Sequence, residues 1–182
     1  MLDRKQNVFD DFIAAGDFLV DEGYTSRERL AICGRSNGGL LVGAVLTQRP
    51  DLCRAVVCEV PLLDMLRYHG FQVARLWIAE YGSPDDPEQF GWLHAYSPYH
   101  RVVDGTRYPA VLLTTALGDS RVDPMHARKM AARLQEATAS GLAVLLRVDT
   151  DAGHGIGKSR SMQFDVATDV WSFLCMQLGV EP

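Results

Sequence analysis

Short apolar runs that alternate with helix-patterned stretches constrain the fold of this chain more than any other feature of its sequence. The runs contain mainly Ala, Val, Ile and Leu and lack the polar–apolar alternation of a strand with one exposed face. Strands that are apolar throughout are typical of parallel sheets, whose faces are both covered by crossover helices. The expected strands are residues 30–33, 55–58, 109–115 and 143–148, and the expected helices are residues 7–22, 38–48, 124–138 and 161–178. We therefore expect an α/β fold built on a parallel sheet with helices on both faces.

A length of 182 residues is typical of one domain. The sequence shows no internal repeat and no linker-like tract, so we expect a single domain over residues 1–182. One stretch, at about residues 61–108, interrupts the alternation of strands and helices and is rich in Trp, Tyr and Pro. We expect it to form an aromatic insertion above the sheet.

Composition and charge exclude several classes of protein. An apolar fraction of 47% is enough to form a hydrophobic core, which excludes a disordered chain. The net charge is −5 and the basic residues are scattered, so we expect no nucleic-acid partner. The apolar runs fall well short of the about 20 residues that cross a bilayer, so we expect no membrane partner.

The cysteines form no C-x-x-C pair and have no histidine at metal-binding spacing. Each lies in an apolar context, so we expect reduced thiols in the core, with no metal and no cofactor. The N-terminal residues contain no apolar signal segment. We therefore expect a cytoplasmic location, with the periplasm as the alternative. The cysteines are Cys33, Cys53, Cys58 and Cys175.

The segment Gly34-Arg35-Ser36-Asn37-Gly38 matches G-x-S-x-G and lies between an expected strand and an expected helix. In that context the chain turns sharply, the glycines give the crowded backbone room, and the serine is exposed above the sheet. The amide of Asn37 then lies at a helix N-terminus, where it can bind an oxyanion. We therefore expect Ser36 to act as a nucleophile; the alternative interpretation is a glycine-rich turn with a surface serine.

A nucleophilic serine needs a histidine base and a carboxylate that orients it, and in folds with this elbow the carboxylate precedes the histidine in the chain. Asp119 follows the third expected strand and His154 follows the fourth, so both should reach the carboxyl edge of the sheet beside Ser36. Asp123 is the main rival of Asp119, and its alternative role is to cap the helix that begins at Pro124. The other two rival carboxylates are Asp149 and Asp151.

Residues 152–159, Ala-Gly-His-Gly-Ile-Gly-Lys-Ser, are close to the phosphate-binding loop G-x-x-x-x-G-K-[ST]. Too few residues follow this segment for a further strand with a magnesium-binding carboxylate, and a nucleotide site would leave the serine elbow unexplained. The sequence therefore favours a serine hydrolase over a nucleotide-binding protein.

Together these segments resemble the catalytic domain of the prolyl oligopeptidase family of serine peptidases, which has the α/β-hydrolase fold. The resemblance runs over nearly the whole chain, and its Ser-Asn-Gly-Gly elbow is more specific than G-x-S-x-G alone. It implies the C-terminal half of an α/β-hydrolase domain, in a serine-type endopeptidase that hydrolyses short peptides on the carboxyl side of proline. The matching segments are residues 5–12, 34–41, 48–52, 63–69, 96–100 and 152–155.

The resemblance also implies a role for each site residue. Ser36 would be the nucleophile, Asp119 the orienting carboxylate and His154 the general base of a reaction through an acyl-enzyme. The amide of Asn37 would supply one oxyanion donor.

By the same resemblance, Trp77 would stack on the proline ring of the substrate, because a flat apolar side chain matches a flat pyrrolidine. Arg121 would donate to the peptide carbonyl just before that proline. The other residues that would line the pocket are Val73, Tyr81 and Val122.

Two departures from the family pattern accompany the resemblance. The family usually has Asp-Asp-Arg where this chain has Asp119-Ser120-Arg121. The β-propeller of the family, its upstream hydrolase strands and a tyrosine that supplies the second oxyanion donor have no counterpart in this sequence. We therefore expect a truncated product whose strand at 30–33 has an exposed edge that favours self-association. The alternatives are a fragment with little activity alone and an esterase or aminopeptidase of the same fold.

Overall fold

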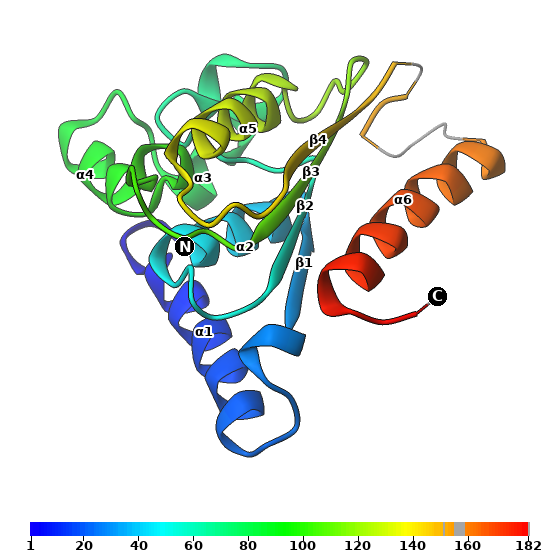
Figure 1. Cartoon of the computed structure of the whole chain (residues 1–182). Coiled ribbons are helices and arrows are strands. Elements are labelled where there is room, and N and C mark those ends of the chain that lie inside the picture. The colour runs from blue at the N-terminus through cyan, green and yellow to red at the C-terminus, as the bar shows by residue number, and fades with distance from the viewer. Residues whose placement is uncertain (151, 155–158, 182) are drawn as a thin grey trace.

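The computed structural model of the chain describes residues 1–150, 152–154 and 159–181. A parallel sheet of four strands, in the order β1-β2-β3-β4, lies at the centre of the fold. Figure 1 shows this sheet nearly edge-on, with most of the helices on one side and the C-terminal helix alone on the other. The expected α/β architecture is therefore confirmed.

The strands follow the apolar runs of the sequence. Strand β3 is buried along its whole length, as expected for a strand with neighbours on both edges and helices on both faces. The register places Arg35 opposite Glu59, and Glu59 opposite Thr114, so the carboxyl ends of these three parallel strands lie at the same end of the sheet. The strand bounds are Ala31–Arg35 for β1, Ala55–Glu59 for β2, Ala110–Ala116 for β3 and Val144–Asp149 for β4.

The long helices occur where the periodicity predicted them. Helices α2 and α5 pack on one face of the sheet, α1 packs against α2, and α6 packs on the opposite face against β2 and β3. Their bounds are Gln6–Asp21 for α1, Asn37–Gln48 for α2, Met125–Ala137 for α5 and Arg160–Leu178 for α6.

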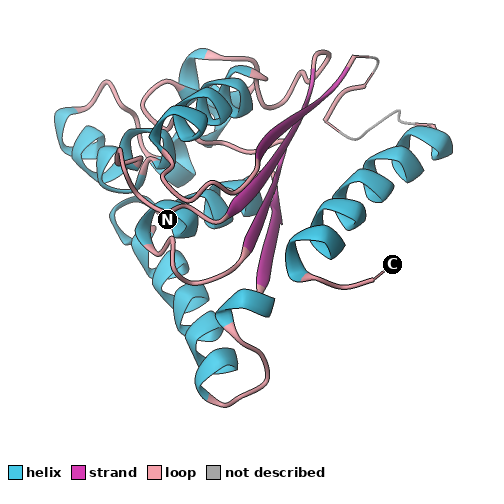
Figure 2. Ribbon diagram, in the orientation of Figure 1, coloured by secondary structure: helices cyan, strands magenta, loops and turns pink. Residues whose placement is uncertain are grey.

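The aromatic insertion contains only helices and loops between β2 and β3 (Figure 2). Helix α4 begins where the Asp86 carboxylate accepts the backbone N–H groups of Glu88 and Gln89, with Pro87 at the first helical position. The insertion comprises α3 (Ile78–Tyr81), α4 (Pro87–Tyr96) and the 3-10 turns Tyr68–Gly70, Ala74–Trp77 and Pro98–Arg101. Two further 3-10 turns cover Leu2–Arg4 and Arg27–Arg29.

The core has three parts. The largest lies between the sheet and the helices α2 and α5, and a second lies where the insertion packs on the first turns of α1 and α2. The third lies under α6 and is small, and this helix leaves Trp171, Phe164 and Met176 more than 60% exposed. The insertion is therefore anchored by its own core, while α6 holds the other face with few buried side chains.

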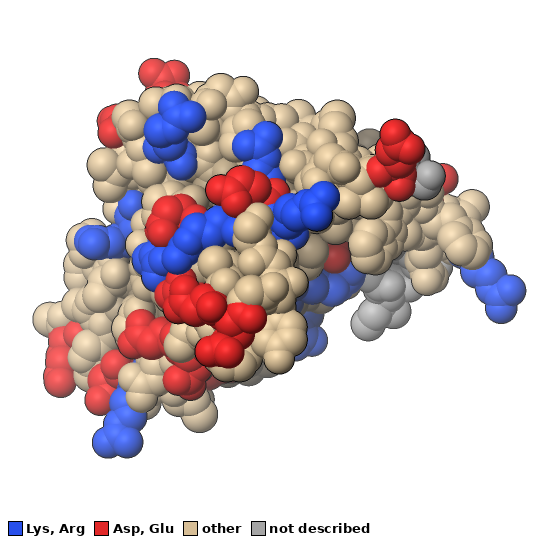
Figure 3. Space-filling view, turned by 60° about the horizontal axis from the view of Figure 1, so that its bottom comes forward, with Lys and Arg blue, Asp and Glu red and all other residues tan. Residues whose placement is uncertain are grey.

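The burial of the cysteines differs in part from what the sequence predicted. All four cysteines are free, but Cys33 is exposed and Cys175 is only partly buried, so the expectation of core thiols is confirmed only for Cys53 and Cys58. The Cys33 side chain lies on the face of the sheet on which α6 packs, where it lines a cavity. Acidic and basic side chains are interspersed on the face shown in Figure 3. Among the described residues, no helix is long and apolar enough to cross a membrane, and no cluster of three or more His, Cys, Asp or Glu side chains could hold a metal ion.

Candidate active site

Ser36 occupies the sharp turn between β1 and α2. Its backbone has φ 56° and ψ −115°, a conformation that costs a non-glycine residue about 1–3 kcal/mol. The turn is fixed on one side by the Ser36 N–H, which donates to the Glu59 carbonyl of β2 at 2.8 Å. The strain therefore persists because the sheet and the helix on either side determine the path of the chain.

The glycines around Ser36 differ in whether the fold leaves space for a side chain at their positions. A Cβ at Gly34 would lie 2.0 Å from the Gly38 carbonyl oxygen, and a Cβ at Gly39 would lie 2.6 Å from the Cβ of Pro61. A Cβ at Gly38 would meet nothing within 4 Å. The expectation that the motif glycines relieve crowding is therefore confirmed for Gly34 and wrong for Gly38.

The structure brings together the three side chains that the sequence predicted as nucleophile, base and orienting carboxylate. The Nε2 atom of His154 lies 3.1 Å from the Ser36 hydroxyl oxygen, and its Nδ1 atom lies 2.7 Å from Asp119 Oδ2. Asp119 is 2% exposed and lies in the loop after β3, and His154 lies in the loop after β4. Both loops are at the carboxyl edge of the sheet, above Ser36.

The electrostatics of Asp119 fix the direction of these hydrogen bonds. Burial opposes ionisation of this carboxyl, but the hydrogen bonds from His154 and from the backbone N–H groups of Val122 and Arg121 outweigh it and lower its pKa. An ionised carboxylate only accepts, so His154 Nδ1 carries the proton that is donated to it. In a neutral ring Nε2 is then the acceptor, and the Ser36 hydroxyl donates to it.

The rival carboxylates have other partners. Asp123 accepts the Met125 N–H at 2.8 Å and so orders the start of α5, which is the alternative role expected for it. Asp149, at the end of β4, pairs with Arg147. Asp151 lies outside the described residues, as do residues 155–158 of the segment whose sequence is close to a phosphate-binding motif.

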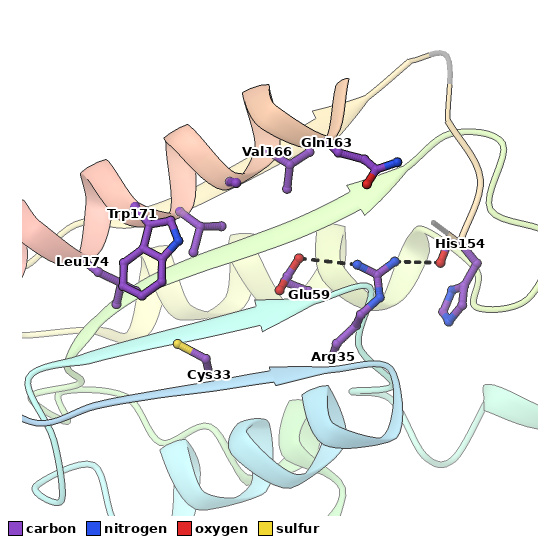
Figure 4. A pocket seen from close by; sticks show the side chains of 10 residues that line it. Cys33, Arg35, Glu59, His154, Gln163, Val166, Trp171 and Leu174 are labelled. Atoms are coloured by element: carbon purple, nitrogen blue, oxygen red, sulfur yellow. Dashed lines mark hydrogen bonds and ion pairs between the residues drawn. The ribbon is translucent and has the colours of Figure 1, made fainter. Parts of the chain in front are cut away.

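Arg35 reaches the same loop from the strand that precedes the nucleophile. Its guanidinium donates to the His154 carbonyl oxygen at 2.7 Å and lies 3.6 Å from the Glu59 carboxylate (Figure 4). The loop that carries His154 is thus tied to β1 and β2. Sequence reasoning treated Arg35 only as a variable position of the motif; its contact spans 119 residues of sequence, and no local pattern reveals it.

A cavity of about 720 Å³ adjoins these charged groups under α6. It is lined by Cys33, Arg35, Glu59 and His154 and by one face of the helix, including Trp171 (Figure 4). Ser36 does not line this cavity.

A second cavity, of about 700 Å³, contains the reactive groups. Its lining includes Ser36, His154, Val73 and Arg121. The Arg121 guanidinium lies 5.7 Å from the centre of the Trp77 ring, so these two side chains form one wall of a cation and an aromatic face. Val73 and Arg121 therefore line the same cavity as Ser36, and Trp77 is connected to it through its contact with Arg121.

The remaining expected pocket residues lie deeper. Tyr81 and Val122 are each 3% exposed and belong to the core of the insertion. The Tyr81 hydroxyl donates to the Asn37 side-chain oxygen at 2.9 Å. Lys5, 5% exposed, donates to the same oxygen at 3.3 Å, a contact that the sequence analysis did not foresee.

A parallel sheet, a strand–serine–helix elbow and a histidine between the serine and a buried carboxylate are the marks of the α/β-hydrolase class. The comparisons narrow the class. The sequence profile of the prolyl oligopeptidase family matches residues 1–181. The chain belongs to the prolyl oligopeptidase family.

The relatives agree with this assignment. The chain is 45% identical over 179 residues to a prolyl endopeptidase of Elizabethkingia miricola, covering 98% of this chain and 25% of that protein. It is 43% identical over 181 residues to the prolyl endopeptidase of Dictyostelium discoideum, covering 98% of this chain and 24% of that protein. The chain thus spans about a quarter of the length of these relatives.

Solved structures match equally well. A structure from a study of two prolyl endopeptidases is 54% identical, with a TM-score of 0.96, and the match covers 99% of this chain and 27% of that chain. A post-proline cleaving enzyme from Rickettsia typhi is 35% identical, with a TM-score of 0.94, and the match covers 99% of this chain and 26% of that chain. At these identities the likeness extends beyond the fold to the family.

Proposed function

We propose that this chain carries the catalytic centre of a serine peptidase that cleaves peptides after proline. The observation that supports this most directly is the hydrogen-bonded series from Ser36 Oγ to His154 Nε2, at 3.1 Å, and from His154 Nδ1 to Asp119, at 2.7 Å. Three solved structures of a Galerina marginata prolyl oligopeptidase B with bound substrate carry alanine in place of a serine, an aspartate or a histidine. Those three residues follow the same chain order as the three here.

The reaction would proceed in two steps. His154 Nε2 takes the hydroxyl proton of Ser36 as Oγ forms a bond to the scissile carbonyl carbon, and the carbonyl oxygen becomes an oxyanion. The amide of Asn37, at the start of α2, stabilises that oxyanion. His154 then gives the proton to the leaving amine, the C–N bond breaks, and an acyl-enzyme remains. Water attacks the ester by the same route, with His154 again the base.

The pocket supports the preference for proline. Val73 lines the cavity of Ser36, and Trp77 lies against Arg121, which lines the same cavity; a pyrrolidine ring would lie flat on the Trp77 ring. The Arg121 guanidinium lines the same cavity and donates to the carbonyl before the proline. Relatives at 35–54% identity include proteins described as a post-proline cleaving enzyme and as prolyl endopeptidases. Short peptides that contain proline are the proposed substrates.

The competing possibilities are a chain that has the triad but does little chemistry alone and an esterase or aminopeptidase of the same fold. Both are decided by reactivity. The test is to label the purified chain with a fluorophosphonate, in parallel with Ser36→Ala and His154→Ala, and then to compare hydrolysis of a proline amide and a simple acyl ester.

The proposal is supported if labelling needs both residues and if the wild type hydrolyses the proline amide faster than variants of the pocket wall do. Preference for the ester supports the esterase alternative. A folded chain that is not labelled overturns the proposal and supports the alternative of a chain that does little chemistry alone. Labelling that persists in His154→Ala contradicts the role assigned to His154.

A further inference from the structure

Lys5 is a buried cation next to the nucleophile elbow. It is 5% exposed, although lysine is among the residues that are least often buried. It lies just before α1, more than thirty residues before Ser36 in the chain. A buried ammonium needs partners that compensate its lost hydration, so its contacts show what it organises.

Three groups surround the Lys5 ammonium. It donates to the Asn37 side-chain oxygen at 3.3 Å and to Glu80 Oε1 at 3.0 Å, and it lies 4.9 Å from the centre of the Tyr81 ring. Asn37 is the first residue of α2, and Glu80 and Tyr81 belong to α3 of the insertion. One cation thus joins the elbow to the insertion.

The Asn37 side-chain oxygen receives both of its donors from this group. The Tyr81 hydroxyl donates to it at 2.9 Å, and burial raises the pKa of Tyr81, so the hydroxyl keeps the proton that it donates. Asn37 itself is exposed, whereas Lys5 and Tyr81 are buried. An exposed carboxamide is normally free to rotate, and here two buried donors hold it in one orientation.

The backbone of Asn37 is where this orientation matters. Its amide directly follows the strained turn at Ser36 and is the proposed oxyanion donor. A displacement of about 1 Å at a reacting centre can cost about 100-fold in rate. A clamp on the side chain of the same residue limits how far that amide moves when the oxyanion forms.

We propose that Lys5 is a positioning residue for the oxyanion site, because it holds the Asn37 carboxamide in place. Glu80 and Tyr81 connect Lys5 and Asn37 to α3, the helix that follows Trp77. This inference rests on the proposed function, because it assigns Asn37 the oxyanion. Lys5 does not touch the substrate. Its effect is on the geometry of Asn37.

The experiment measures the rate of fluorophosphonate labelling of Ser36 in the 182-residue chain. Lys5→Met keeps an unbranched side chain that is one heavy atom shorter and removes the charge, and we expect labelling to slow by about 10-fold or more. Lys129→Met is the control, since Lys129 also pairs with a carboxylate, that of Asp64, and lies 4.1 Å from an aromatic ring centre, that of Tyr99. The control should leave the labelling rate unchanged even where it lowers stability.

An epistasis test separates positioning from general stabilisation. In an Asn37→Ala background the carboxamide is gone, so Lys5→Met should slow labelling no further. A further loss of about 10-fold there, or an equal loss in Lys129→Met, overturns the inference. Urea denaturation of each variant shows whether the labelled protein is folded.

A second readout does not depend on reactivity. In the wild type the side-chain amide of Asn37 should have a rigid NMR order parameter, about 0.85, and Lys5→Met should lower it toward about 0.6. An unchanged order parameter overturns the inference whether or not the chain is labelled. Absence of labelling in the wild type, with the order parameter falling as expected in Lys5→Met, contradicts the proposed function and leaves the clamp on Asn37 supported.

Discussion

At the scale of single residues, the site depends on a few side chains whose protonation and conformation are fixed by their neighbours. Asp119 accepts from His154 and from two backbone N–H groups, which keeps it ionised. Asp123, only four positions along the chain, accepts the N–H of Met125 instead. Two aspartates of the same type therefore have different tasks because one is at the edge of the sheet and the other at the start of a helix.

Replacing Asp119 with Asn tests this division. An amide can donate its own N–H to His154 Nδ1, which favours the wrong tautomer, and it gives no charge to stabilise the imidazolium. We expect Asp119→Asn to slow fluorophosphonate labelling by up to about 10⁴-fold with little loss of stability. Asp123→Asn is the control and should label at the wild-type rate; the reverse pattern would show that Asp123 orients the histidine.

At the scale of secondary-structure elements, the turn from β1 to α2 depends on space at one glycine of the motif and not at the other. A Cβ at Gly34 would overlap the Gly38 carbonyl, which lies on the first turn of α2. A Cβ at Gly38 would project into open space. The two positions look equivalent in the sequence motif and are not equivalent in the fold.

Alanine at each position measures the difference. We expect Gly34→Ala to push α2 away from β1, to lower the free energy of unfolding by about 1–3 kcal/mol and to reduce labelling by at least about 100-fold. Gly38→Ala should label normally and gain up to about 1 kcal/mol from helix propensity. Urea denaturation and labelling rates check both, and equal effects at the two positions would refute the steric explanation.

His126 in helix α5 leads to a prediction of how the stability of the fold depends on pH. Burial lowers the pKa of His126 from 6.5 to about 4, while the charges of Asp64 and Asp123 act in the opposite direction and Lys129 reinforces the lowering. The neutral ring accepts the N–H groups of Leu63 and Asp64 at the start of the insertion.

The pKa of His126 is lower in the folded chain than in the unfolded chain, so at pH values between these two the unfolded chain binds more protons. Stability should therefore fall as the pH is lowered from about 6.5 to about 4, by on the order of 3 kcal/mol. His126→Asn keeps an acceptor at the same position and does not titrate, so its unfolding free energy should vary less over this range. Identical pH profiles would contradict the assignment; the lowered pKa of Asp119 acts in a different window, below about pH 4.

At the scale of the whole molecule, β1 is an edge strand in the described part of the chain, since it pairs only with β2. The Leu30 carbonyl accepts from Arg54 N–H and the Ser36 N–H donates to the Glu59 carbonyl, so the even-numbered residues of this segment bond toward β2. The backbone groups of the odd-numbered residues between them therefore point to the open edge of the sheet. The sequence analysis expected this edge to favour self-association. We therefore expect a concentration-dependent dimer through β1 in light scattering under reducing conditions.

Cys33→Pro tests the edge. It removes an N–H that points away from β2, so it should weaken the dimer without breaking the sheet. Cys33→Ser keeps that N–H and removes the exposed thiol, so it should still dimerise. A wild-type chain that stays monomeric at all concentrations, with the amides of Ala31, Cys33 and Arg35 protected from exchange, would refute self-association through this edge.

The parts of the molecule that could be predicted from sequence are those governed by local rules. Apolar runs placed all four strands, and helical periodicity placed the long helices, with boundaries within two residues. The order of serine, aspartate and histidine predicted that Ser36, Asp119 and His154 lie together, as they do, because each follows a strand of the same sheet. The sequence favoured Asp119 with Asp123 as its main rival, since four residues of sequence do not show which carboxylate turns inward.

What the sequence did not predict depends on contacts between distant segments. Lys5 meets Asn37 and Glu80 across 32 and 75 residues, and Arg35 meets His154 across 119. The exposure of Cys33 depends on where α6 lies, which a short apolar run does not specify. Local patterns report which element forms, whereas these roles follow from how the elements pack.

The distance along the chain between Ser36 and His154 has a consequence for folding. Their hydrogen bond spans 118 residues, so it closes only after all four strands have entered the sheet. Contacts of such long range form late, because the cost of closing the loop precedes their gain. During synthesis, at about 5–20 residues per second, the serine emerges well before its base and stays unreactive in the meantime. In this topology the proposed nucleophile and its base therefore meet only once the sheet has formed.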